Sequence, residues 1–397
     1  MTFPDTAPPC LFDAGFFADP YATYARLRVE GAAHHLATPE GSLIWLVPRE
    51  RDVRAALNHP QLSVNKAHST HGFRGFSLPP ALDANLLNVD HADHLRLRRL
   101  VSQAFTARRV EQMRSTIEAS AHRLADALDG GGIHDLAAVY ASPLPITVIG
   151  DLLAVPDTDR LAFSSWVGTM FAPEHPGQAG EAIKKIQEFL TGLVAERRRA
   201  PGDDLLSGLI AARDEGDKLN EDELVSLAFL ILMAGSENAQ HVITTGVYTL
   251  LQHPQQLAAL QADRKLRPNA VEEILRYAHP NQMAIRRFPL EDLDIGGVRI
   301  PRGETVMLCL ASANRDPDRY PDADRFDIRR ADKAHLSLGH GLHYCLGAAL
   351  ARIEVEAALS ALLDRFPRLR LAAAPHEVRW RHSWRSHALR ELPVTVA

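Results

Sequence analysis

The pattern of hydrophobic and polar residues along the chain is mostly helical. The longest pattern covers residues 221–252, starts with acidic residues and is followed by Pro254, which are common start and stop signals of a helix. Residues 227–233 within it are apolar on every side, so we expect this helix to be buried. Further helices are predicted over residues 18–30, 49–57, 108–128, 144–153 and 348–366.

Strand patterns are few and short. Residues 42–47 form an apolar stretch of strand length, and residues 298–308 predict a hairpin that turns at residues 301–303. Residues 63–88 show little periodicity and contain several glycines and prolines, among them Gly75. A loop of this length inside a compact fold is usually functional or mobile.

The composition is that of an ordinary globular protein. The 397 residues are 46% hydrophobic and 23% charged. The net charge of −5 gives no reason to expect nucleic-acid binding. No Gly/Ser linker, charge block or repeat divides the chain, so we expect residues 1–397 to form one domain.

Cysteine usage and the longest apolar run bear on the compartment. Three cysteines, Cys10, Cys309 and Cys345, are too few for a disulfide framework and favour a reducing compartment. Residues 1–10 lack a basic segment followed by an apolar run. The longest apolar run, residues 227–234, is far shorter than the roughly 20 residues that span a bilayer. We therefore expect a soluble cytoplasmic protein with no membrane contact.

The stretch with the most distinctive chemistry is residues 337–347, Ser-Leu-Gly-His-Gly-Leu-His-Tyr-Cys-Leu-Gly, directly before the last predicted helix. Cys345 therefore lies at a helix N-terminus, where unpaired amides and the helix dipole favour a thiolate over a thiol. Gly339, Gly341 and Gly347 allow the backbone to pack closely around the sulfur. A thiolate in such a position is a soft, anionic metal ligand.

Other interpretations of this stretch compete with a metal ligand. A lone cysteine is most often a buried small hydrophobe. A structural zinc site needs about four ligands at close spacing, and Cys10 and Cys309 are both remote in sequence. The glycines do not form a dinucleotide-binding fingerprint, because Tyr344 occupies the third glycine position of G-x-G-x-x-G.

The stretch resembles the haem-binding cysteine loop of the cytochrome P450 family, F-G-x-G-x-H-x-C-x-G. Every fixed position matches except the first, where Leu338 replaces Phe. The resemblance implies one mostly helical domain with small β-sheets, in which haem b is buried between the long central helix and the helix after the cysteine. Cys345 would be the ligand of the haem iron.

Basic residues elsewhere match the family's propionate-binding positions. His94 and Arg98 are four residues apart, on one helix face, and resemble the H-x-x-x-R motif that holds a haem propionate. Read alone, such a pair is more often part of a solvated basic face. By the same resemblance Arg287, with Arg286 as the alternative, and His343 would help neutralise the propionates.

The central helix resembles the family's A-G-x-E/D-T segment. Ala234, Gly235 and Glu237 match, whereas Asn238 stands where the family has Thr. Glu237 and Asn238 are therefore the candidate catalytic residues, with Glu237 helping to deliver protons. A carboxamide donates hydrogen bonds but is a poor proton relay, so water, substrate or His241 would replace the Thr hydroxyl.

Three further segments match the family in the order expected along the chain. Glu273 and Arg276 resemble its E-x-x-R pair, which Arg330 would complete as a structural trio. Residues 161–185 resemble the lid over the active site, and residues 380–390 resemble the last strand pair, whose turn reaches into the pocket.

The resemblance implies a monooxygenase that uses dioxygen and two electrons to insert one oxygen atom into a small organic substrate. Residues 283–285 and 383–387 are expected to line the pocket. Several candidate pocket residues indicate an aromatic or amide-bearing secondary metabolite: Asn65, His241, Trp384, Arg385 and His387. Since Asn238 replaces Thr, oxidative C–C or C–N coupling of aromatic rings is the alternative reaction.

Two non-catalytic interpretations stay open, a haem sensor or carrier and a haem-free binding module. Because the chain has no flavin-like region, we expect a ferredoxin and a ferredoxin reductase as electron donors to a monomer. Five arginines form a candidate basic patch for the ferredoxin, with scattered surface charges as the alternative: Arg96, Arg99, Arg108, Arg109 and Arg352.

Overall fold

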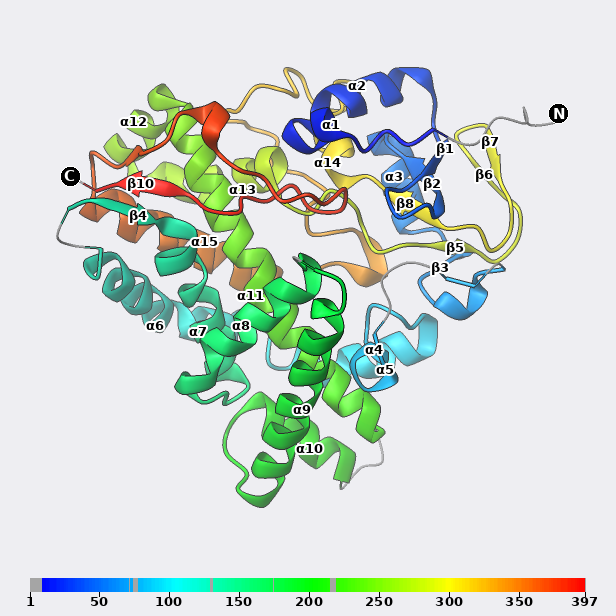
Figure 1. Cartoon of the computed structure of the whole chain (residues 1–397), viewed down its shortest axis with the longest axis horizontal. Helices are drawn as coiled ribbons and strands as arrows, with labels where there is room; N and C mark the ends of the chain where they lie inside the picture. Colours follow the sequence, from blue (N-terminus) through cyan, green and yellow to red (C-terminus); the bar gives the residue numbers. More distant parts are fainter. Residues whose placement is uncertain are drawn as a thin grey trace.

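The computed structural model describes residues 9–70, 72–73, 78–128, 131–173, 175–214 and 219–396. The chain is mainly helical, with short strands in small sheets beside the helical body (Figure 1). The expected fold class, mainly helical with small β-sheets, is thus confirmed. Gly75, within the loop predicted over residues 63–88, lies outside the described residues.

Helix α11, Glu221–Gln252, runs through the middle of the molecule (Figure 1). Its bounds are those predicted, because both ends carry local signals. The side chain of Asn220 accepts a hydrogen bond from the N–H of Glu223, and the Glu223 carboxylate accepts one from the N–H of Asn220. Pro254 follows the last turn and cannot continue the helix. Residues 227–232 are buried, as their all-round apolar pattern predicts.

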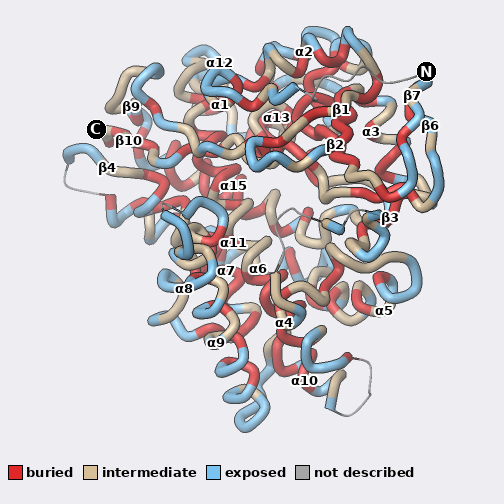
Figure 2. Tube along the Cα trace, turned by 45° about the vertical axis from the view of Figure 1, so that its right-hand side comes forward, coloured by how far each residue is buried: buried red, intermediate tan, exposed pale blue. Residues whose placement is uncertain are grey.

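Helices around α11 form the main core. Helix α7, Pro143–Leu152, and helix α13, Arg267–Ala278, both pack against it. Helix α15, Ala348–Arg365, packs against α11, α13 and helix α6, Ala107–Asp126. Figure 2 shows buried positions gathered along α11 and α15. This packing places the start of α15, and with it the cysteine loop, beside the central helix.

The segment expected as a lid, residues 161–185, consists of parts of two helices and their connection. Helix α8, Asp157–Phe171, and helix α9, Gln178–Arg199, pack against each other and against α11. The buried residues of α9 recur at helical spacing, for example Ile186 and Leu190.

The hairpin predicted over residues 298–308 is wrong. Strand β7, Val298–Ile300, pairs antiparallel with the preceding strand β6, Leu293–Ile295. The turn between them consists of Gly296 and Gly297, whose φ angles are 59° and 87°. A two-residue hairpin turn of this kind requires positive φ, which glycine adopts at no steric cost.

Strand β8, Val306–Leu308, instead joins a sheet with distant segments. It runs parallel to β2, Leu43–Val47, and β1, His34–Ala37, pairs antiparallel with the other edge of β2. The strand predicted over residues 42–47 is therefore confirmed. This sheet forms one wall of the cavity described below, through residues such as Ile44 and Met307.

The remaining elements surround this framework. Within the described residues, the other α-helices are α1 Ala14–Ala18, α2 Pro20–Glu30, α3 Glu50–Leu57, α4 Pro80–Asp83, α5 His91–Ser102, α10 Leu205–Asp214, α12 Pro254–Ala262 and α14 Leu310–Ala313. The other strands are β3 Leu62–Ser63, β4 Ile133–Asp135, β5 Phe288–Pro289, β9 Arg370–Leu371 and β10 Pro393–Thr395.

Within the described ranges, no single helix has the length and apolar composition of a membrane span. One bent pair, Ala137–Leu152 with Asp157–Phe171, passes the same test only when joined across a bend of 118°.

Candidate active site

Cys345 lies in a tight loop directly before α15. Gly339 and Gly341 in this loop have φ angles of 75° and 73°, a conformation that favours glycine. The backbone N–H of Cys345 donates to the carbonyl oxygen of Leu338 at 2.8 Å. The backbone N–H of Gly347 in turn donates to the sulfur. The glycine-rich setting predicted for Cys345 is thus present.

Burial and the groups around the sulfur act on this thiol in opposite directions. Burial raises the pKa of the Cys345 thiol, and the opposing effects of the Gly347 amide, Arg98 and Arg352 do not offset it. Without a bound cation, burial therefore has the larger effect on the pKa of this thiol. A bound metal cation would supply the missing positive charge, because coordination deprotonates a thiol.

Four basic side chains that the sequence marked separately come together near Cys345. The rings of His94, on α5, and His343, in the cysteine loop, have centroids 4.2 Å apart. Arg98, one turn after His94, donates from Nη2 to the carbonyl oxygen of Tyr344 at 2.8 Å. Arg287 is buried, at 2% exposure, and its charge acts on His343.

The electrostatics of this basic cluster call for an anion. Burial and the charge of Arg98 lower the pKa of His94 to about 4. Burial, Arg287 and His94 lower the pKa of His343 to about 3, and Asp90 is the carboxylate that opposes these effects. Nδ1 of His94 has no hydrogen-bond partner among the described residues. The cluster thus contains buried hydrogen-bond donors and cations, and only one carboxylate among the described residues, Asp90, acts on them. A ligand with two carboxylates, such as the two propionates of a haem, would supply the missing negative charge.

Glu237, on α11, is held in an ion pair. Its Oε1 accepts hydrogen bonds from Arg381 Nη1 at 2.7 Å and from His241 Nε2 at 3.0 Å. Burial alone would raise the pKa of Glu237, but His241 and Arg381 outweigh it and lower the pKa to about 2. Burial also lowers the pKa of His241. We therefore assign the compensating positive charge at neutral pH to Arg381, with His241 as a neutral donor.

Asn238, the next residue on α11, uses both ends of its carboxamide. Nδ2 donates to the carbonyl oxygen of Ala234 at 3.3 Å, and Oδ1 accepts from Nδ2 of Asn281 at 2.9 Å. Gly235 is needed beside it, because a Cβ there would overlap the side chain of Ile149 on α7. The carboxamide is therefore fixed by the helix on one side and by a residue from another segment on the other.

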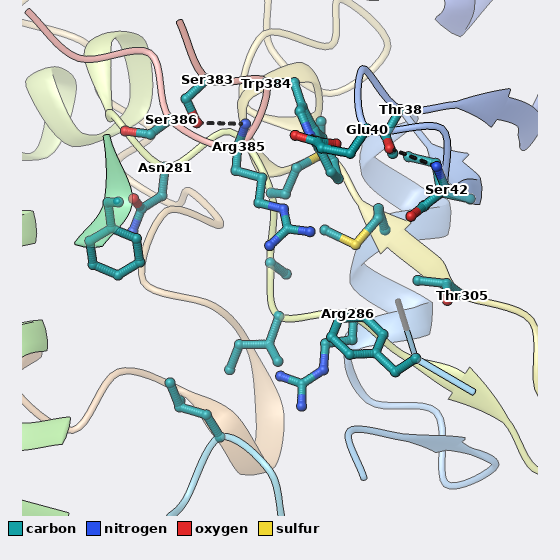
Figure 3. A pocket seen from close by; sticks show the side chains of 18 of the residues that line it. Thr38, Glu40, Ser42, Asn281, Arg286, Thr305, Ser383, Trp384, Arg385 and Ser386 are labelled. Atoms are coloured by element: carbon teal, nitrogen blue, oxygen red, sulfur yellow. Dashed lines mark hydrogen bonds between the residues drawn. The ribbon is translucent and has the colours of Figure 1, made fainter. Parts of the chain in front are cut away.

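A cavity of about 1260 Å³ lies against α11, with Glu237, Asn238 and His241 in its wall. Figure 3 shows part of it from close by. Segments from most of the chain line the cavity: residues 38–44, the loop around Asn85 and Asn88, the end of α8, residues 281–286 and residues 381–386. Cys345 and the basic cluster are not part of this lining.

Most of the predicted pocket lining is present. The cavity is bordered by Met283, Trp384 and Arg385, which belong to the two segments that we expected to line it. His387 does not, because its ring stacks on Trp380 with centroids 3.8 Å apart. Asn65 is also outside the lining. Its side chain accepts a hydrogen bond from the backbone N–H of Ala67 and so caps a local turn.

The predicted trio of Glu273, Arg276 and Arg330 assembles in the core. Arg276 Nη2 lies 2.8 Å from Glu273 Oε1, and both side chains are 2% exposed. Arg330 Nε lies 3.3 Å from the second oxygen of Glu273. Both arginines also donate to backbone carbonyls of the loop before the cysteine, among them that of residue 325. The trio therefore fastens this loop to α13.

A family model described as Cytochrome P450 matches residues 146–372. The chain is 44% identical to cytochrome P450 monooxygenase PikC from Streptomyces venezuelae, over 98% of this chain and 95% of that protein. The chain belongs to the cytochrome P450 family.

Two solved cytochrome P450 structures are also close to this one. The tirandamycin C-bound monooxygenase TamI superimposes with a TM-score of 0.94 and 42% identity, covering 98% of this chain and 100% of TamI. CxnD, a cytochrome P450 for C–S bond formation in chuangxinmycin biosynthesis, superimposes with a TM-score of 0.88 and 36% identity. The match covers 99% of this chain and 98% of CxnD.

Membership of the cytochrome P450 family implies a haem-thiolate cofactor and a monooxygenase that acts on a small molecule. The residues present fit that cofactor. The cysteine loop matches the family's ligand loop, and the basic cluster beside it has buried donors without a carboxylate partner. Haem propionates would supply the missing negative charge, and iron would supply the positive charge that the Cys345 sulfur lacks.

The five arginines proposed as a patch in this cytochrome P450 differ in availability. Arg99, Arg108 and Arg109 are exposed. Arg96 instead pairs with Glu223 at 2.5 Å, and Arg352 pairs with Glu272 at 2.6 Å. Because a glutamate compensates each of them, these two arginines contribute little net positive charge to a surface that would bind a ferredoxin. Two apolar side chains near the cysteine, Leu342 and Tyr344, are also exposed.

Three residues of this site were missed from the sequence. Arg381 and Asn281 hold Glu237 and Asn238 from segments far along the chain, so no local spacing could reveal them. Asp90 accepts from Val64 N–H at 3.0 Å and lies among the basic residues of the cluster. Its place directly before the H-x-x-x-R helix was the one available signal.

Proposed function

We propose that this cytochrome P450 binds haem b through Cys345 and oxidises a small aromatic or amide-bearing secondary metabolite by inserting one oxygen atom. The convergence of four basic side chains beside the cysteine carries the proposal: His94, Arg98, Arg287 and His343. When bound, a haem with thiolate ligation supplies dioxygen activation by favouring O–O cleavage.

The protein's own side chains have distinct tasks in this proposal. The basic cluster neutralises the propionates and fixes the orientation of the cofactor. Glu237 is ionised and hydrogen-bonded to Arg381, so it can accept and pass a proton only when this pair opens. Asn238 donates hydrogen bonds from a fixed carboxamide but does not itself titrate.

The cavity supports a substrate of substantial size. Its volume of about 1260 Å³ exceeds the usual range of roughly 300–1,000 Å³ for small-molecule sites. Apolar groups such as Phe229 and Met233 of α11 alternate with polar groups such as Asn281 and Ser383. PikC and TamI, to which the chain is similar, are both monooxygenases.

Oxidative coupling of aromatic rings, without oxygen insertion, is the second candidate. Asn238 favours it, because the carboxamide gives less proton relay than a hydroxyl. The similarity to CxnD adds weight, since that protein serves C–S bond formation. A non-catalytic haem sensor is a third candidate, and it predicts no substrate-dependent use of NAD(P)H.

We further propose that the enzyme is a cytoplasmic monomer that receives electrons from a ferredoxin and its reductase. All three cysteines are free, which supports a reducing compartment. Arg99, Arg108 and Arg109 are available for an acidic ferredoxin, and Leu342 beside the cysteine gives an apolar contact on the surface.

Absorption spectra test the cofactor assignment. Reduced protein with carbon monoxide should give the red-shifted band of thiolate-ligated haem, and Cys345→Ala should abolish it. Cys10→Ala is the matched control, because Cys10 is exposed, and should keep the band. A Cys345→Ala variant with an unchanged band would refute the assignment.

Labelled dioxygen separates the candidate reactions. Oxygen insertion predicts one labelled atom in the product, whereas coupling predicts a product that joins two rings and carries no label. Type I shifts of the haem band on titration with aromatic or amide-bearing compounds test the substrate class. Tight binding of simple terpenes or unsubstituted fatty acids alone would contradict that class.

A further inference from the structure

The cavity contains two arginines whose charges are not neutralised by a bonded carboxylate. Arg286 comes from the segment before β5, and Arg385 comes from the turn of the C-terminal segment. Figure 3 shows both guanidinium groups extending into the same open space. Among the described residues, Nε of each arginine is buried without a hydrogen-bond partner.

Other cations in the cavity wall are bound to acidic partners. Lys66 Nζ lies 2.5 Å from Asp83, and Arg381 lies 2.7 Å from Glu237. By contrast, Arg286 donates from Nη2 to a neutral acceptor, the amide oxygen of Asn88.

Arg385 has still fewer partners. Its side chain makes no hydrogen bond or ion pair with any other described residue and lies over the ring of Trp384, 4.7 Å from the centroid. The carboxylate whose charge acts on it, Glu40, is exposed and accepts a hydrogen bond from Trp384 Nε1 at 3.4 Å.

Both groups remain cationic at neutral pH despite their surroundings. Burial and the charge of Arg385 lower the pKa of Arg286 to about 10, against the opposing charges of Asp83 and Asp90. Burial also lowers the pKa of Arg385. Two like charges that act on one another in a half-buried space cost free energy unless an anion binds between them.

The cofactor does not account for this pair. Arg287 and Arg286 are adjacent, and side chains alternate in direction along an extended segment. The arginine charges that act on His343 in the basic cluster are those of Arg287 and Arg98. Arg286 instead lines the cavity with Asn88 and Arg385. The structure thus separates a cofactor arginine from a cavity arginine.

We propose that the substrate carries an acidic group, a carboxylate or an equivalent organic anion, that binds between Arg286 and Arg385. This inference rests on the proposed function, because it names a chemical feature of the substrate of the same cavity. The planar guanidinium fork matches a carboxylate with two parallel hydrogen bonds. Phe229, Met233 and Ile285 provide apolar wall for the rest of the molecule.

Binding measured by calorimetry on the haem-loaded protein tests the proposal directly. The probes are N-decanoyl-phenylalanine and its methyl ester, which differ in the charge of one group. Wild type should bind the acid about tenfold or more tightly than the ester, as charge-assisted hydrogen bonds predict. Arg286→Gln and Arg385→Gln should each remove most of this preference while leaving ester affinity within about twofold.

Two further variants keep the test interpretable. Arg385→Lys retains the charge and should retain most of the acid preference. Arg299→Gln is the matched control, because Arg299 is exposed and pairs with Asp292 at 2.6 Å outside the cavity lining. Equal affinity of wild type for acid and ester, or equal losses for both probes in the two cavity variants, would overturn the proposal.

The carbon monoxide spectrum separates this outcome from failure of the proposed function. A normal thiolate band with no acid preference refutes only the acidic substrate. Absence of the band in wild type refutes the haem-thiolate function, and the same calorimetry on that protein as isolated then measures the acid preference by itself. An Arg286→Gln variant that loses haem but keeps the acid preference would make Arg286 a cofactor residue and overturn its role here.

Discussion

The side chains of Asn238 and Asn281 are joined by a hydrogen bond of 2.9 Å from Nδ2 of Asn281 to Oδ1 of Asn238. Asn238 stands on the central helix at the position where the A-G-x-E/D-T pattern has Thr, and Asn281 comes from the segment after α13. Its partner fixes which end of the Asn238 carboxamide faces the helix. This supports the view that Asn238 is adapted to the reaction.

That view predicts the outcome of replacing Asn238. Product formed per NADPH consumed should fall for both Asn238→Thr and Asn238→Ala, by about twofold or more, because neither side chain can accept the hydrogen bond from Asn281 in the same position. Asn281→Ala should give a similar but smaller loss. Better coupling to the native product in Asn238→Thr than in wild type would show that Asn238 is not adapted.

Breaking the Glu237–Arg381 ion pair should make product formation per electron depend on pH. In wild type the pKa of Glu237 is about 2, so this carboxylate stays ionised between about pH 5 and about pH 8. In Arg381→Gln, His241 still lowers the pKa of Glu237, but one of the two opposing groups is gone, so burial moves this pKa upward toward the window. Product per electron should then change across the window in Arg381→Gln and not in wild type.

The double variant Glu237→Gln/Arg381→Gln is the control for this effect and should give a flat profile, because it lacks the titrating group. Glu237→Gln alone should lower the rate of product formation by about 10²-fold, the usual cost of losing a proton-transfer residue. A flat profile in Arg381→Gln would exclude Glu237 as the group that the ion pair controls.

The basic cluster predicts loss of cofactor when its members are replaced. His94→Ala and Arg287→Gln should each lower haem affinity by about tenfold or more, because each removes a buried donor for the propionates. Transfer of haem to excess apomyoglobin measures this as a faster release. Arg286→Gln serves as the neighbouring control and should release haem at the wild-type rate.

Electron delivery should depend more on the exposed arginines than on those paired with glutamates. Arg108→Gln/Arg109→Gln should slow reduction by an acidic ferredoxin several-fold at low salt and should weaken the salt dependence of the rate. Arg352→Gln should have a smaller effect on the salt dependence, because Glu272 already compensates its charge. Arg26→Gln on α2 is the surface control. A rate that does not change with salt in wild type would contradict the docking proposal.

The buried carboxyl group of Glu354 on α15 should make the free energy of unfolding fall as the pH rises. The residue is 2% exposed, its Oε1 has no partner among the described residues, and burial raises its pKa well above the ordinary value of 4.5. The folded protein therefore keeps a proton that the unfolded chain releases above about pH 4.5, so this contribution to stability is full below that pH and declines toward the folded pKa.

Glu354→Gln removes the titrating group. At about pH 8 the variant should be more stable than wild type, and the difference should shrink near pH 5. Chemical unfolding at the two pH values measures it. Glu356→Gln, two residues further along α15, is the control, because Glu356 is partly exposed and pairs with Arg114 at 3.3 Å. Parallel curves for wild type and Glu354→Gln would rule out a buried, protonated Glu354.

Features that local chemistry encodes could be predicted from the amino-acid sequence. The bounds of α11 follow from its capping box at Asn220 and from Pro254, and both act within a few residues. The cysteine loop is readable because Gly339 and Gly341 must adopt positive φ at fixed offsets from Cys345. His94 and Arg98 were predictable as a pair, since one helical turn separates them.

The tertiary structure decided whatever depends on distant segments or on burial. It joined β8 to β2 where the sequence predicted a local hairpin, and it turned His387 away from the cavity onto Trp380. It also brought Arg381 to Glu237 and enclosed the Cys345 sulfur enough to raise its pKa. Periodicity and capping act over a few residues, whereas desolvation and long-range pairing are properties of the whole packed chain, so only the fold could fix them.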